Sequence, residues 1–348
     1  MKMLGEDLII KMWESLVDKG IGGILRPWHE QRLDKQRLQT RRAEMLLIAQ
    51  TELDVKKIAS GEAVYCSDGS VKLLADNRGR VGDAFEKIEP DVGDISVVDL
   101  AVSAAKSESV KREINVAKAI MYAETELSSG AEDSVDEDID GDWIFAWREY
   151  AGRVSSEELQ ALWGKVLAGE VKKPGTYSMR TLEFLKCLSR GEAEVIERVA
   201  RFVITNAIAK NLEDFYKSKG VVFKDFLLLQ NLGLIAGVES LGLQMQYSSR
   251  VSDRYVNYMF AGAKIIIIED SDASKMISIP AYSVTPLGLE VFRLSGVSAD
   301  LDYVEEVARL ISQQVSTVKI ADFVPTGKEE GNYFNERLVK PLSGDPAA

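Results

Sequence analysis

The sequence predicts a mainly α fold with long N-terminal helices, a central helical bundle and a C-terminal winged-helix-like α+β module. Three observations predict this fold class. Apolar residues recur at helical spacing over much of residues 4–212, and three of the five tryptophans lie within residues 142–188. A helix, strand-like segments and a closing helix then follow in order over residues 226–294.

Changes of composition divide the chain into five predicted parts. The 348 residues and 46% hydrophobic content suffice for more than one buried core. From the N-terminus, we expect amphipathic and long basic helices over residues 1–64, a Gly-rich linker over residues 65–94, a central helical domain over residues 95–188 with an acidic loop at residues 131–142, a winged-helix-like module over residues 189–296, and a C-terminal helix and tail over residues 297–348.

The first predicted helix is amphipathic and leads into a basic segment. Glycines at positions 20, 22 and 23 separate it from a long helix that begins after Pro27. One interpretation is contact with a membrane surface or a partner. The other is packing against the same protein, which the acidic residues Glu14 and Asp18 on the polar face favour. The candidate interaction residues are Trp13, Leu16, Ile21, Ile24, Arg26, Trp28, Arg32, Arg37, Arg41 and Arg42.

The central stretch carries three closely spaced helix signals. Asp142 is the expected N-cap of one helix, and Ser155 with Glu158 forms the S-x-x-E pattern of a capping box for the next. Trp163 lies on the apolar face of that second helix. After a Pro-Gly turn, Ser178 can cap a third helix. Three helices joined by short links are expected to pack around one shared apolar seam.

The sequence offers no complete catalytic, cofactor or metal site. Residues 136–141 match the D-x-D-x-D-G opening of a calcium loop, but Trp147 stands at the twelfth position, where a bidentate glutamate is required. We therefore interpret the acidic run as a solvated linker. His29 is the only histidine, and Cys66 and Cys187 lack C-x-x-C spacing. We expect no catalytic residues, no cofactor and no metal.

The C-terminal elements follow the order of a winged helix, a fold that often reads DNA. The expected recognition helix exposes few basic residues beyond Lys224, and the chain has a formal net charge of −12. A structural or protein-binding use of this module is therefore favoured over DNA binding. After a helix over residues 300–318, the chain from Thr326 is expected to be a loose tail.

One segment resembles a known family. The run SSEELQALWGKVLAGEVKKPGTYSMRTLEFLKCLSRGEAE resembles a bacterial family of unknown function, number 2806 among the domains of unknown function, which is itself similar to the abortive-infection alpha proteins. Its most specific part is the LW-x-x-x-LAGE-x-x-x-PG-x-[YF]-S core. The segments GIGGILRPWHEQRL and VKREINVAKAI resemble other parts of the family. The resemblance implies a bacterial protein of phage defence and supplies no catalytic residues.

Together these observations predict a non-enzymatic phage-defence protein of the abortive-infection type. It would associate with a phage component, a partner defence protein or a membrane surface, and we expect a homo-oligomer. No apolar run approaches the length of about 18 residues that spans a membrane, so we expect a cytoplasmic protein, with peripheral contact at the inner membrane as the alternative. The alternative functions are a winged-helix DNA-binding transcriptional regulator and an enzyme with an unrecognised site.

Overall fold

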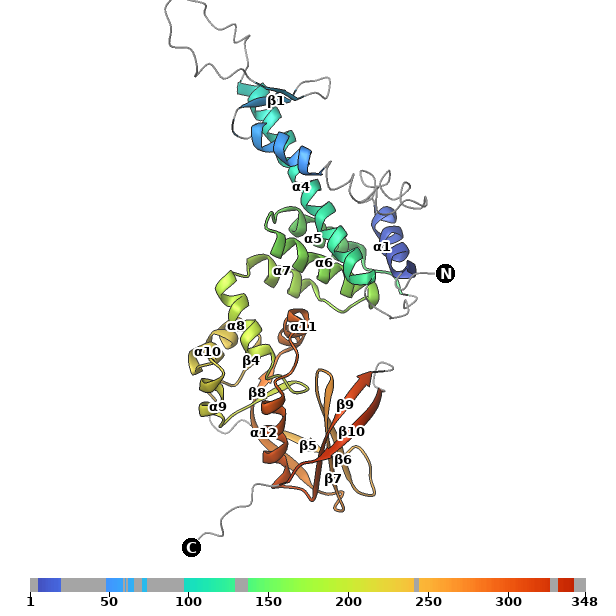
Figure 1. Cartoon of the computed structure of the whole chain (residues 1–348), viewed down its shortest axis with the longest axis vertical. Helices are drawn as coiled ribbons and strands as arrows, with labels where there is room; N and C mark the ends of the chain where they lie inside the picture. The colour runs from blue at the N-terminus through green and yellow to red at the C-terminus, as the bar shows by residue number, and fades with distance from the viewer. Residues whose placement is uncertain are drawn as a thin grey trace, which may run out of the picture. The chain divides into compact units, whose positions relative to one another are not determined.

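The computed structural model describes residues 6–19, 48–58, 60, 62–65, 71–73, 97–128, 137–240, 244–325 and 331–340 (Figure 1). They belong to two compact units, residues 1–182 and residues 183–348. Among the described residues, the first unit is helical apart from one pair of short strands, and the second unit contains both larger sheets.

The elements of the first unit are α1 (Glu6–Asp18), β1 (Ala63–Tyr65), β2 (Val71–Leu73), α4 (Val97–Ser128), α5 (Gly141–Gly152), α6 (Glu157–Lys172) and α7 (Met179–Cys187). Residues 48–58 are also helical, and the two short strands pair antiparallel. The helices α1, α5 and α6 of the first unit all contact α4.

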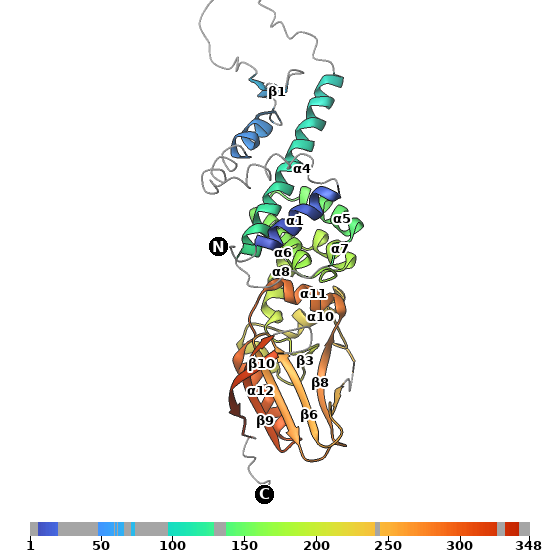
Figure 2. The same cartoon turned by 90° about the vertical axis from the view of Figure 1, so that its right-hand side faces the viewer.

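Helices α4 and α6 approach each other closely at Gly164. A Cβ atom on Gly164 would lie 2.5 Å from Tyr122 Cβ and 2.8 Å from the carbonyl oxygen of Ala119. Both distances are too short for a real contact, so any side chain would push the helices apart. Helix α1 contacts both α4 and α6 (Figure 2).

Buried tryptophans connect the helices of this unit through hydrogen bonds. Trp13 Nε1 donates to Glu124 Oε1 at 2.7 Å, which joins α1 to α4. Trp147 Nε1 donates to the carbonyl oxygen of Trp163 at 2.9 Å, which joins α5 to α6. Because a buried indole N–H needs an acceptor, each bond fixes the position of one helix relative to the next.

A buried glutamate holds the turn after α6. Glu170 is 2% exposed, and its carboxylate accepts the backbone N–H groups of Gly175 at 2.6 Å and Tyr177 at 3.0 Å. Gly175 has φ +79°, a conformation that favours glycine. Gly169 faces the Tyr177 ring, where a Cβ would lie 2.6 Å from Cε2. The LAGE and PG-x-Y parts of the sequence core therefore form one structural unit.

Two predicted helix starts are corrected by the structure. Asp140, not Asp142, caps α5 by accepting the backbone N–H of Trp143 at 2.9 Å. Ser156, not Ser155, caps α6 by accepting the N–H of Leu159. Neighbouring Asp and Ser residues satisfy the same capping pattern, so the sequence does not select between them.

The second unit contains five helices and eight strands among its described residues. Its elements are α8 (Arg190–Ala200), β3 (Ala207–Ala209), α9 (Glu213–Ser218), α10 (Phe223–Asn231), β4 (Ile235–Ala236), β5 (Gln244–Ser248), β6 (Tyr255–Ala261), β7 (Lys264–Asp270), β8 (Met276–Val284), α11 (Pro286–Ser295), α12 (Leu301–Ser312), β9 (Thr317–Pro325) and β10 (Gly331–Leu338).

The predicted fold class was wrong, because this unit contains two antiparallel four-stranded sheets and the chain is not a mainly α protein with a clear helical bundle. One sheet has the order β10-β9-β7-β6. The other has the order β3-β8-β4, and β5 also pairs with β8. Strand β3 lies within residues 4–212, where apolar spacing indicated helices, and β10 lies inside the predicted tail. Strand β3 forms by pairing with the distant strand β8, and β10 forms by pairing with β9, the strand just before it in the chain. Helical periodicity reports neither pairing.

An aromatic cluster holds β3 in the core of the second unit. Tyr303 Oη accepts the backbone N–H of Ala209 at 2.7 Å, and Tyr216 donates its hydroxyl to the Ala209 carbonyl at 2.6 Å. Both rings lie against Phe202, with centroids 5.2 Å away. Burial raises the pKa of Tyr303 to about 12, so its hydroxyl stays protonated.

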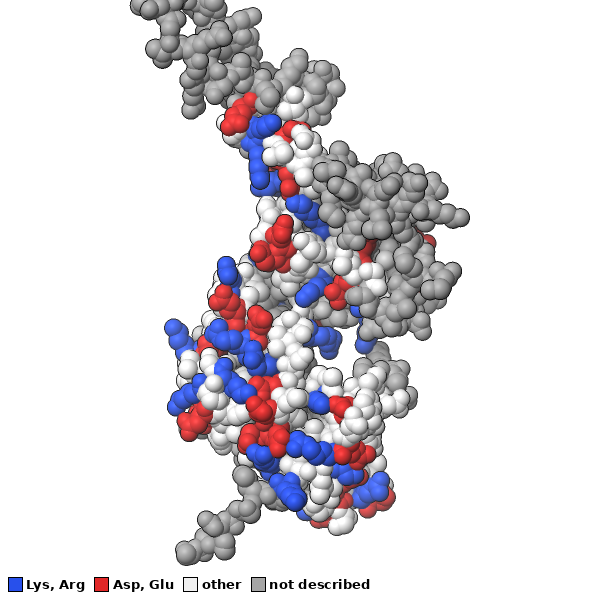
Figure 3. All heavy atoms as spheres, in the orientation of Figure 1, with Lys and Arg blue, Asp and Glu red and all other residues white. Residues whose placement is uncertain are grey.

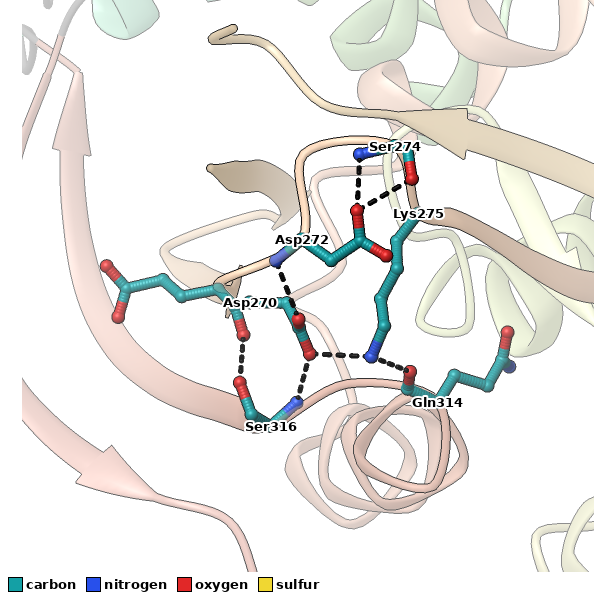
Figure 4. A network of polar contacts seen from close by, with 7 residues as sticks. Asp270, Asp272, Ser274, Lys275, Gln314 and Ser316 are labelled. Carbon is teal, nitrogen blue, oxygen red and sulfur yellow. Dashed lines mark hydrogen bonds and ion pairs between the residues drawn. The ribbon is translucent and has the colours of Figure 1, made fainter. Parts of the chain in front are cut away.

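Asp270 ties the end of β7 to the start of β9 (Figure 4). Its carboxylate accepts hydrogen bonds from Lys275 Nζ at 2.8 Å and from the backbone N–H groups of Asp272 at 3.0 Å and Ser316 at 2.8 Å. Lys275 also donates to the carbonyl oxygen of Gln314 at 3.2 Å. These donors, Lys275 first, hold the pKa of Asp270 well below its usual range.

Replacement of Trp163 by alanine should lower the free energy of unfolding of the first unit by about 3–5 kcal/mol, because a large ring that is 1% exposed leaves a cavity. Denaturant unfolding followed by tryptophan fluorescence measures this, since all five tryptophans lie within residues 1–182. Phe145→Ala is the matched control, because Phe145 is 53% exposed. A loss below about 1 kcal/mol for Trp163→Ala would contradict its role in the core.

Asp270→Asn should lower the melting temperature at pH 7 and flatten its pH dependence. Folding depresses the pKa of Asp270, so its stabilising contribution is complete above the unfolded value of about 3.9 and is lost as the pH falls toward the folded value. The difference in melting temperature between wild type and variant should therefore shrink as the pH drops from about 4 to about 2. Circular dichroism melts check this, with Asp253→Asn as an exposed control. A pH-independent difference would show that the carboxylate charge is not responsible.

Candidate interaction surface

The sheet β10-β9-β7-β6 has two apolar faces (Figure 2 shows its strands). The inner face is part of the large core of the second unit, to which it contributes Tyr255, Met259, Ile266, Ile268 and Val318. The opposite side is called the outer face here. In most antiparallel sheets one face packs on the core and the other is polar and solvated, so an apolar outer face requires an explanation.

The outer face follows from four consecutive isoleucines in β7. Successive side chains of a strand point to opposite sides of the sheet. Ile266 and Ile268 therefore enter the inner core, while Ile265 and Ile267 lie on the outer face. Such a continuous apolar run is typical of a strand that is covered on both faces.

Aromatic residues surround these isoleucines on the outer face. The cross-strand neighbours of Ile265 are Phe260 on β6 and Ala321 on β9, and the neighbour of Ile267 on β6 is Tyr258. The Phe260 and Phe323 rings lie 5.0 Å apart. The resulting cluster consists of the buried residues Ile265, Ile267 and Ala321, with Tyr258, Phe260 and Phe323 partly buried against them.

Strand β10 extends this apolar surface to the edge of the sheet. Tyr333 pairs with Phe323, and Leu338 pairs with Lys319, so both side chains share the outer face with their partners. Tyr333 is 43% exposed and Leu338 is 59% exposed. Large apolar side chains next to an aromatic cluster are the composition of a protein contact surface.

The outer face has opposite charges at its two sides. On the β6 side, the guanidinium carbon of Arg250 lies 5.8 Å from the centre of the Tyr258 ring. On the β10 side, Lys319 Nζ lies 2.9 Å from Glu336 and 3.5 Å from Glu269. The hydrogen bond with Glu336, the largest effect, raises the pKa of Lys319. One ammonium shared by two carboxylates leaves the β10 side with an excess negative charge.

The free edge of β10 is not a regular strand. Its pairing with β9 shifts by one residue between Phe334 and Arg337, and Asn335 within this bulge has φ +58°. Asn335 donates to Asp322 at 2.8 Å, and Arg337 donates to Glu305 on α12 at 2.9 Å. The bulge disrupts the ladder that another strand would need, so contacts here are expected to use side chains.

Two of the predicted interaction residues are buried in the first unit, and the others lie outside the described residues. Trp13 is 3% exposed and Leu16 is 1% exposed, so the first unit itself covers both. Ile21, Ile24, Arg26, Trp28, Arg32, Arg37, Arg41 and Arg42 lie outside the described residues. Residues 264–269 were predicted to form a strand, but the meaning of their four consecutive isoleucines for the two faces of the sheet was not considered. Four isoleucines in succession indicate a strand that is apolar on both faces, and this signal predicts the outer face.

The described residues do not indicate binding through a patch of one charge, a metal ion or a membrane-spanning helix. On the side drawn in Figure 3, acidic and basic residues of the second unit are interspersed rather than gathered by sign. Within the described ranges, no three His, Cys, Asp or Glu side chains are grouped to hold a metal ion. Asp140, from the calcium-loop-like run, caps α5 instead. Among the helices that the structure describes, none has the length and apolar character to cross a membrane.

Comparison with known proteins identifies the family. The sequence model of the family described as "Protein of unknown function (DUF2806)" matches residues 103–308. This range begins inside α4, includes α5 to α11 with β6 and β7 of the outer face, and ends inside α12. A search of curated proteins and a search of solved structures gave no match. Because the match covers more than half of the chain, the protein belongs to the DUF2806 family.

Proposed function

We propose that this protein is a non-enzymatic bacterial phage-defence protein that works in the cytoplasm by binding through its outer face. The observation that carries the binding part is the apolar outer face of the β10-β9-β7-β6 sheet. The phage-defence part rests on the resemblance of residues 155–194 to the DUF2806 family, which is itself similar to the abortive-infection alpha proteins. That resemblance supplies no catalytic residues, and the outer face offers a means of action that needs none.

The composition of the outer face supports association rather than simple exposure to water. Burial of a large apolar side chain contributes about 1.5–3 kcal/mol, so Tyr333 and Leu338 alone favour a bound state. Tyr258, Phe260 and Phe323 add rings that are already held in place by packing. Ordered aromatic side chains lose little conformational entropy on binding, which makes them effective anchors.

The position of the surface on a rigid scaffold also supports this function. Asp270 holds the end of β7 against the start of β9, and both strands contribute to the outer face. The inner side of the same strands packs in the core of the second unit. A surface held in this way can bind without a large change of shape.

Loss of the exposed apolar residues should abolish phage protection. Tyr333→Glu/Leu338→Glu should weaken binding by about a hundredfold or more, because two buried contacts become charged. The measurement is the efficiency of phage plating on bacteria that express each variant at equal levels. Phe223→Glu/Leu301→Glu is the matched control, since those residues are 55% and 58% exposed in the same unit but lie at the starts of α10 and α12.

The control should protect as well as the wild type. Full protection by the Tyr333→Glu/Leu338→Glu variant would exclude the outer face from function. A wild-type protein that protects against no phage in a broad panel would contradict phage defence. Equal melting temperatures of both double variants would show that any loss reflects binding rather than unfolding.

A further inference from the structure

We infer that the outer face binds a second copy of this chain, with the two sheets packed face to face so that β6 of one copy lies across from β10 of the other. This inference names the partner of the surface in the proposed function and rests on that use of the surface. It requires a two-fold axis that runs parallel to the strands between the two sheets. Such an axis reverses the strand order, so β7 of one copy faces β9 of the other.

Face-to-face packing matches the shape and composition of the surface. Two sheets pack about 10 Å apart when their facing side chains interdigitate. Each outer face supplies aliphatic side chains from β7 and aromatic side chains from β6 and β9. A two-fold dimer would cover Ile265 and Ile267 with Ala321 and Phe323 of the second copy. Ile265 and Ile267 are already buried within one copy, and the second copy would also cover Tyr258, Phe260 and Phe323, which are only partly buried.

Charge complementarity selects a second copy in this orientation. No ion pair of Arg250 is found within the described residues, and its guanidinium lies on the outer face beside Tyr258. Glu336 and Glu269 share the single ammonium of Lys319 on the opposite side. Reversal of the strand order places Arg250 of each copy near Glu336 of the other, which gives two equivalent attractions. With β10 over β10 and β6 over β6, like charges would meet instead.

The edge of the sheet favours this mode over pairing of strands. A second β10 strand added to the first would require a regular ladder of backbone hydrogen bonds. The bulge at Asn335, with φ +58°, disrupts that ladder in both copies. The charged residues Glu336 and Arg337 follow directly, and charged side chains on an edge strand oppose such pairing. The apolar outer face is therefore the surface that joins the two copies.

Mixed charge reversal tests the arrangement. Arg250→Glu should place two carboxylates together at both contacts, and Glu336→Arg should place two guanidinium groups together. Each variant alone should dimerise about tenfold or more weakly than the wild type at low ionic strength. An equimolar mixture should regain wild-type affinity. In the mixed dimer, the introduced carboxylate of one variant meets the introduced guanidinium of the other at one contact. At the second contact, the native Arg250 and Glu336 meet. Sedimentation equilibrium and native mass spectrometry with one isotope-labelled chain measure both results.

Controls separate this inference from misfolding and from the proposed function. Lys217→Glu, an exposed charge on α9, should leave the dimer unchanged, and all variants should keep the wild-type circular dichroism spectrum. A monomeric wild type, or single variants that dimerise normally, would overturn the inference. So would a mixture that fails to regain affinity.

The two proposals fail in different assays. If the wild type is a monomer but Tyr333→Glu/Leu338→Glu loses phage protection, the outer face binds another partner and the second copy is excluded. If the dimer forms and responds to charge reversal but the double variant still protects, the dimer stands and the proposed function is wrong.

Discussion

The alternation of side chains along β7 is the constraint on which the second unit depends. A strand has two faces, so four consecutive isoleucines must place two on each side of the sheet. The inner pair enters the core formed with α12 and β9. The outer pair needs cover of its own, and Tyr258, Phe260 and Phe323 pack against it, so that both isoleucines are buried while these rings stay partly exposed. The binding surface is thus a consequence of the same strand that builds the core.

The first unit reaches a specific structure by a different route. Its core combines large apolar side chains with several hydrogen-bonded polar groups. Trp13 meets Glu124, Trp147 meets the Trp163 carbonyl, and Glu170 satisfies two backbone N–H groups of the following turn. An unpaired polar group at any of these positions would cost free energy, so each bond excludes alternative packings. The most specific part of the resembling segment therefore has a structural role.

Sequence patterns predicted the parts of this chain whose signals are local. Helices α5 to α7 were expected, because helical periodicity, capping residues and the Pro-Gly turn all lie close together in the sequence. Strand β3 was missed because it exists by pairing with the distant strand β8. Strand β10 pairs with β9, the strand just before it in the chain, and was missed because the glycines and prolines around it indicated a tail. The role of Glu170 was also hidden, since a glutamate in a helix is usually solvated. The outer face had a local signal in residues 265–268, but only the register with β6 and β9 shows which aromatic residues join it.

The left-handed backbone conformation of Asn335 also bears on the aggregation of this protein. A sheet that combines an apolar face with an eight-residue edge strand has the ingredients of a cross-β fibre, in which identical strands stack without limit. Such stacking needs every chain to repeat the same straight register. One residue with φ +58° in the middle of the edge makes each repeat incompatible with the next. The bulge at Asn335 therefore disfavours the stacking of further strands on this edge of an apolar sheet.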